Sequence, residues 1–188
     1  MIRENALDLP KAGFSVQDMT RMAICLAFCC VTAFITFPLP FTPGLVTALT
    51  IGISLTAFVL PPKLAFITIA AYLFLGAVGL PIYPGGVGGL GRLMGPTAGF
   101  YFGWPIVCFL QSYFKGREAI FLRYALVTVL IGVPLTYVGG LISMMVVLKV
   151  GFYEGLMLAV VPFLFGDVLK ALLAAWLGVK VNQIIQKR

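Results

Sequence analysis

The stretch RYALVTVLIGVPLTYVGGLISMMVVL, residues 123–148, decides the fold class. It carries no charge between Arg123 and Lys149, and it is longer than the ~20 residues that an α-helix needs to cross a bilayer. The whole chain of 188 residues is 61% hydrophobic and 10% charged. A soluble domain averages about 45–50% apolar residues and about 25% charged residues. We therefore predict an all-α integral membrane protein.

The remaining apolar stretches predict a bundle of six transmembrane helices in a single membrane domain that covers residues 1–188. The six stretches run over residues 21–37, 45–60, 64–82, 98–114, 123–148 and 155–179. Residues 1–20 and 180–188 form the two tails. The first tail has no apolar core followed by a small-residue cleavage site, so we do not expect it to be a signal peptide.

The lysines and arginines predict the orientation in the membrane. The chain has 13 lysines and arginines. In the six-helix scheme, ten of them lie in the tails and turns of one side, and the exceptions are Arg92, Lys149 and Lys170. Basic loops stay in the cytoplasm, so we expect a multi-pass protein of the cell (inner) membrane with both termini cytoplasmic. The net charge of +7 does not indicate nucleic acid, because the basic residues lie between the spans rather than along one face.

The chain offers little for catalysis or for metal binding. It has no histidine, which excludes histidine nucleophile pairs and histidine metal sites. Its cysteines lie inside apolar stretches, where free thiols behave as small hydrophobes. An intramembrane enzyme would need paired carboxylates or a Ser–Lys pair, but Asp167 is the only acidic residue inside a predicted span. A channel would need rings of polar groups along a pore. We expect no enzyme, cofactor or metal site.

The segment GLPIYPGGVGGLGRLMGPT, residues 79–97, is the first candidate for ligand contact. It lacks the GK[ST] and βαβ contexts of nucleotide-binding loops. A flexible linker is the alternative, but linkers are usually polar and this segment is apolar apart from Arg92. Its glycines, Gly86, Gly89 and Gly91 among them, allow close approach of the backbone to a ligand. Tyr83 is expected either to pack on the ligand or to lie in the interfacial aromatic belt.

Charged residues mark the second candidate. Asp167 and Lys170 stand three residues apart in the sixth stretch and so share a helix face. Intramembrane charges cost about 2.5–3.5 kcal/mol on insertion scales and face the protein interior. A purely structural ion pair is one interpretation, whereas a carboxylate beside an ammonium also suits a ureido or amide ligand. Arg92 suits a ligand carboxylate, or else extends to the outer headgroups.

Several of these segments resemble the BioY family, the biotin-binding S components of energy-coupling factor (ECF) transporters. Three segments resemble the central signature of the family, namely LGAVGLP (75–81), GGVGGLG (85–91) and GPTAGF (95–100). Gly166-Asp167 together with Lys170 resembles its second signature. The resemblance implies a six-helix bundle with a biotin site near the outer face.

By the same resemblance, Asp167 and Lys170 hold the ureido end of biotin, Arg92 lies near its carboxylate, and Tyr83 and the glycine-rich loop cover it. The implied partners are a membrane coupling protein and two cytoplasmic ATPases. Ala23 and Ala27 form a small-residue stripe that suits docking of the coupling protein, or else packing within the monomer. Residues 40–50 lack a glutamine that the family usually carries there, so another small vitamin-like carboxylate stays an alternative ligand.

Overall fold

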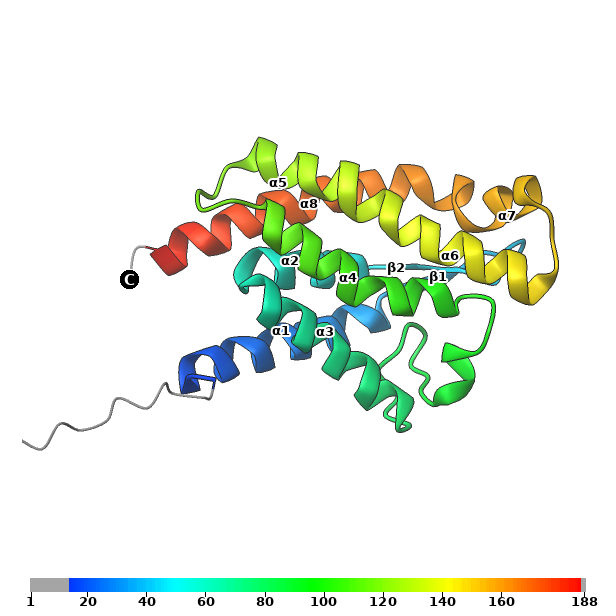
Figure 1. Cartoon of the computed structure of the whole chain (residues 1–188), viewed down its shortest axis with the longest axis horizontal. Helices are drawn as coiled ribbons and strands as arrows, with labels where there is room; N and C mark the ends of the chain where they lie inside the picture. The colour runs from blue at the N-terminus through cyan, green and yellow to red at the C-terminus, as the bar shows by residue number, and fades with distance from the viewer. Residues whose placement is uncertain (1–13, 187–188) are drawn as a thin grey trace, which may run out of the picture.

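The computed structural model describes residues 14–186 and is built almost entirely of helices (Figure 1). Its first half holds three helices and a small hairpin: α1 (Val16–Phe34), β1 (Thr36–Pro38), β2 (Leu45–Thr47), α2 (Leu49–Val59) and α3 (Pro62–Ala77). Its second half follows a 3-10 turn: Leu90–Leu93, α4 (Ala98–Phe114), α5 (Phe121–Val127), α6 (Val133–Leu148), α7 (Phe152–Ala159) and α8 (Val161–Gln186). The predicted helical architecture is confirmed.

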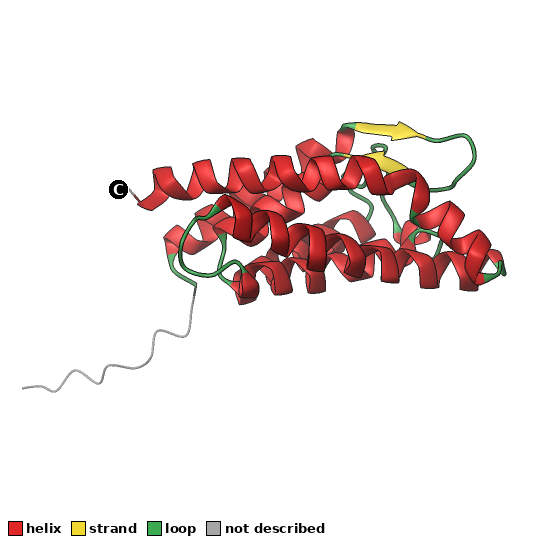
Figure 2. Cartoon of the chain, turned by 90° about the horizontal axis from the view of Figure 1, so that it is seen from above, coloured by secondary structure: helices red, strands yellow, loops and turns green. Residues whose placement is uncertain are grey.

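Three helical stretches of the described residues are long and apolar enough to cross a membrane, namely Val16–Phe34, Phe121–Leu148 and Val161–Ile185. The middle stretch joins α5 to α6 through a π-helical turn over Thr128–Gly132. Leu49–Val59 and Pro62–Ala77 are shorter apolar helices. Figure 2 shows that the helices extend mostly along the long axis of the molecule.

The first helix begins earlier than predicted, inside the segment expected to be a tail. It starts at Val16, and the Ser15 side chain caps it by accepting a hydrogen bond of 3.0 Å from the Asp18 N–H. A serine in this position satisfies one of the free N–H groups of a helix start. The rest of the predicted tail, residues 1–13, lies outside the described residues.

The predicted second span was wrong in its first turn. Residues Leu45–Thr47 form a strand that pairs antiparallel with Thr36–Pro38, with Thr36 opposite Thr47. The helix begins only at Leu49, whose N–H donates to Thr47 Oγ1 at 3.1 Å. Most of α2 is buried, so this short helix occupies the centre of the bundle, between α1, α4 and α8.

The predicted sixth span was also wrong as one helix, because the chain breaks at Val160 between α7 and α8. Pro162 stands in the first turn of α8, where its missing N–H costs least, whereas inside a longer helix it would break the hydrogen-bond ladder. The second helix then continues past the predicted end, to Gln186.

Lys115 fixes the other end of α2. Its Nζ donates to the carbonyls of Ala57, Phe58 and Leu60 at 2.8, 2.8 and 2.6 Å. Carbonyls at the end of a helix have no partner within it, so one ammonium from the residue that follows α4 satisfies the last turn of α2. Asn182 of α8 also donates to Phe58, at 3.0 Å. These hydrogen bonds connect the helices at the end of the molecule where the chain terminates. The hairpin and the glycine-rich loop lie at the opposite end of the molecule (Figure 1).

Candidate ligand-binding site

A hollow lies between the hairpin, the glycine-rich loop and helices α2, α4, α6 and α8. Its lining is mostly apolar or aromatic with a few polar groups, the usual character of a small-molecule site. The residues that line it are Pro43, Gly44, Leu45, Thr47, Thr50, Pro84, Arg92, Thr97, Phe100, Tyr101, Trp104, Thr136, Tyr137, Phe163, Asp167 and Lys170.

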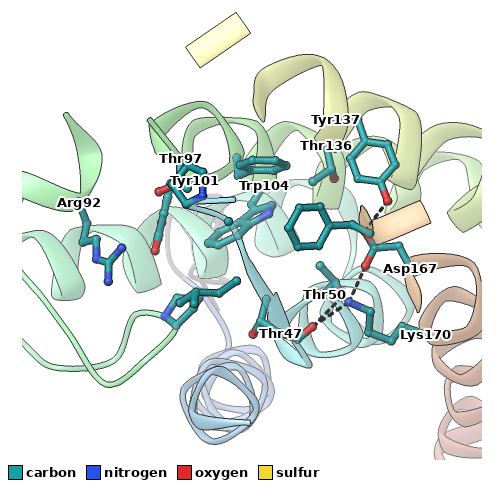
Figure 3. A pocket seen from close by; sticks show the side chains of 16 residues that line it. Thr47, Thr50, Arg92, Thr97, Tyr101, Trp104, Thr136, Tyr137, Asp167 and Lys170 are labelled. Atoms are coloured by element: carbon teal, nitrogen blue, oxygen red, sulfur yellow. Dashed lines mark hydrogen bonds and ion pairs between the residues drawn. The ribbon is translucent and has the colours of Figure 1, made fainter. Parts of the chain in front are cut away.

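Asp167 forms the centre of one polar end of the hollow. Its Oδ1 pairs with Lys170 Nζ at 2.5 Å, and its Oδ2 accepts a hydrogen bond of 2.6 Å from the Tyr137 hydroxyl (Figure 3). Lys170 Nζ also donates to the Thr47 carbonyl at 3.0 Å. Because an ammonium has three N–H donors, one of them remains for a ligand or for water. The two side chains are 14% and 17% exposed, so the pair borders the hollow instead of lying sealed in the core.

Arg92 lies at the other end of the hollow, on the 3-10 turn Leu90–Leu93. Tyr101 and Trp104 stand between it and the Asp167–Lys170 pair (Figure 3). Across residues 14–186 the structure contains one salt bridge, that of Lys170 with Asp167, so the guanidinium has no carboxylate partner there. A free guanidinium that borders a hollow is suited to bind an anionic ligand group.

The glycine-rich loop, residues 79–97, contributes Pro84, Arg92 and Thr97 to the lining of the hollow. Gly86 and Gly89 have φ of +68° and +96°, values that only glycine adopts readily, and neither they nor Gly91 line the hollow. Tyr83 does not line it either, and its ring is fully buried. Its hydroxyl donates to the Leu73 carbonyl at 2.5 Å, and its ring packs edge-on against Tyr101, with the centroids 4.8 Å apart. Tyr83 thus supports an aromatic wall of the site and does not form its surface.

Two polar partners of the Asp167–Lys170 pair were absent from the residues predicted for the site. Tyr137 comes from α6 and the Thr47 carbonyl from the hairpin. A tyrosine in the middle of an apolar span was the available signal for the first. No sequence pattern points to the second, because any residue has a carbonyl. Ala23 and Ala27 lie far along the chain from these groups and are exposed on α1.

The chain is similar to known proteins along most of its length. The chain is 33% identical over 173 residues to the probable biotin transporter BioY of Bacillus subtilis (strain 168), covering 89% of this chain and 91% of that protein. It is also 28% identical to the biotin transporter BioY of Thermotoga maritima, and this match covers 92% of this chain and 100% of that protein.

A solved structure is also similar, the S-component for biotin from an ECF-type ABC transporter. It has a TM-score of 0.82 and 26% identity, and the match covers 89% of this chain and 92% of that one. The model of the BioY family matches residues 5–187. Because this match spans nearly the whole sequence, the chain belongs to the BioY family.

Proposed function

We propose that the chain is the substrate-binding (S) component of a biotin uptake transporter and that it captures biotin from the outer side of the cell membrane. One observation carries the proposal: a single hollow has the Asp167–Lys170 pair at one end, Arg92 at the other and aromatic rings between them. This arrangement suits an elongated ligand with a polar head, an apolar middle and an anionic tail.

Biotin has these three parts. Its ureido N–H groups are donors for the Asp167 carboxylate, and its ureido carbonyl is an acceptor for the free N–H of Lys170. Its ring and aliphatic chain would pack against Tyr101 and Trp104. Its carboxylate would bind Arg92. The ligand is bound and released unchanged, so the role is transport without catalysis.

The same proposal includes six membrane spans with both termini in the cytoplasm. Helices α1, α2, α3 and α4 would each form a span, α5 with α6 the fifth and α7 with α8 the sixth. Lys63, Lys115, Arg117 and Arg123 begin or follow helices at the C-terminal end of the molecule, and Lys180 lies in the last turns of α8, as expected for a cytoplasmic side. The hollow, near the opposite end, would then open outward.

The transporter's partners would be a membrane coupling protein and two cytoplasmic ATPases. The small side chains of Ala23 and Ala27 are exposed one turn apart on α1, which suits close approach of a partner helix. Replacing Ala27 by Trp should reduce co-purification of the coupling protein while leaving biotin binding unchanged.

Uptake of radiolabelled biotin tests the function. Cells that lack their own biotin transport should accumulate the label when they express this chain with a coupling module, and excess unlabelled biotin should compete. Competition by a different vitamin carboxylate, with none by biotin, would assign the site to that other ligand.

A further inference from the structure

A second, deeper hollow continues from the ligand site toward the C-terminal end of the bundle. It shares Thr50, Trp104, Thr136, Asp167 and Lys170 with the first hollow, so the two meet at the ion pair. From there it extends along α2 to Ser54 and along α4 to Gln111. The ligand contacts proposed above do not use these two residues.

Two of the residues that line this hollow each carry a buried polar atom without a hydrogen-bond partner among residues 14–186. These atoms are Gln111 Oε1, an acceptor on a side chain 1% exposed, and Trp104 Nε1, a donor on a side chain 4% exposed. Buried side-chain polar atoms nearly always have a partner, either from the protein or from an ordered water. Inside a membrane bundle bulk solvent cannot supply it.

The two atoms belong to one face of one helix. Trp104 and Gln111 are seven residues apart on α4, which is nearly two full turns and a rise of ~10.5 Å. No single donor–acceptor contact spans that length, whereas a short chain of waters does. Hydroxyl groups line the path as well. Thr128 and Thr136 donate to carbonyls of their own helix at 2.9 and 2.8 Å, which leaves their oxygens free to accept.

The size and shape of the hollow fit a few waters. Its volume is about 30 Å³, and one water needs ~10–15 Å³ by this measure. The wall is also adapted to the amide, since a Cβ at Gly132, the last residue of the π-helical turn, would overlap Gln111 Nε2. The glycine at position 132 therefore leaves room for the Gln111 amide, whose Oε1 has no hydrogen-bond partner among the described residues.

We infer that the deeper hollow holds about two ordered waters, which accept from Trp104 Nε1 and donate to Gln111 Oε1. Gln111 is then a positioning residue. Through these waters it supports the polar end of the ligand site, where Asp167 and Lys170 stand. The effect on biotin rests on the proposed function, but the hydration does not depend on which ligand is bound.

Tryptophan emission of the ligand-free protein tests the hydration. The chain has two tryptophans, so replacing the exposed Trp176 by Phe leaves Trp104 as the only reporter. In this background Gln111→Met should shift the emission to the blue, because the apolar side chain expels the waters. Gln111→Asn keeps the amide oxygen and should emit like the parent. Val107→Ala, on the same wall of the hollow, removes only methyl groups and should also leave the emission unshifted.

Biotin affinity and thermal unfolding of the same variants test the positioning role. Gln111→Met should weaken biotin binding about five- to tenfold without lowering the unfolding temperature, and Gln111→Asn should restore the affinity. Unshifted emission in Gln111→Met, or a high-resolution structure with an empty hollow, would overturn the hydration. A Gln111→Met variant with lower unfolding temperature and parental affinity would overturn the positioning role. Failure of the parent to bind biotin counts only against the proposed function, because the emission is measured without ligand.

Discussion

Replacing Asp167 by Asn tests the polar end of the site most sharply. The variant keeps the size of the side chain but removes the negative charge of the carboxylate. In the parent, this carboxylate pairs with Lys170 Nζ at 2.5 Å and accepts a hydrogen bond of 2.6 Å from the Tyr137 hydroxyl. A hydrogen bond from a ligand N–H to a charged acceptor contributes about 1.5–3 kcal/mol. Biotin affinity should therefore fall about 10- to 100-fold.

The same substitution also leaves Lys170 without its counter-ion. A fully buried pair broken in this way costs about 3–5 kcal/mol, and an exposed pair about 0–1 kcal/mol. With side chains 14% and 17% exposed, we expect a loss of about 2 kcal/mol in the free energy of unfolding. This loss of stability must be measured separately from the loss of affinity for biotin.

A charge-neutral double variant separates them. Asp167→Asn combined with Lys170→Met removes both charges, so the free energy of unfolding should return close to that of the parent. The affinity for biotin should remain as low as in the single Asp167→Asn variant. Tyr137→Phe keeps the ion pair and should weaken binding by less than about fivefold. Calorimetric titration in nanodiscs and denaturant unfolding measure both quantities. An Asp167→Asn variant that binds biotin within twofold of the parent would refute the assignment.

Arg92→Ala should weaken biotin binding about tenfold or more but leave binding of the uncharged biotin amide nearly unchanged; an equal loss for both ligands would show that Arg92 does not bind the carboxylate. Gly99→Ala should cost about 1–3 kcal/mol in unfolding experiments, because a Cβ at Gly99 would overlap the backbone of α6. Gly103→Ala, which faces open space, should cost nothing, and equal losses would contradict the packing argument. Lys115→Met should lower the free energy of unfolding by about 2 kcal/mol, since three carbonyls lose their donor. The exposed Lys63→Met should change it by less than about 0.5 kcal/mol; similar values for the two lysine variants would argue against the role of Lys115.

The charged residues of the site are predictable from the sequence, for a physical reason. A charge inside an apolar span is costly, so the presence of Asp167 and Lys170 in the sixth stretch by itself indicates an interior site. Arg92 is predictable in the same way, as the one charge in an apolar loop. The structure places all three around one hollow.

The hairpin and the role of Tyr83 could not be predicted in this way. Residues 36–38 and 45–47 are short and largely apolar, so they fit a helix as well as a strand, and only their pairing with each other decides between the two. Tyr83 stands in a loop sequence, yet its ring lies behind Tyr101 in the core. That placement depends on contacts between residues distant in sequence, which local patterns do not contain.

The proposed function requires that this chain binds biotin without a partner, and calorimetric titration of the purified wild-type protein in nanodiscs measures that binding. We expect saturable binding at one site per chain in the absence of any partner protein. A cooperatively unfolding, correctly folded preparation that shows no saturable binding of biotin would contradict it.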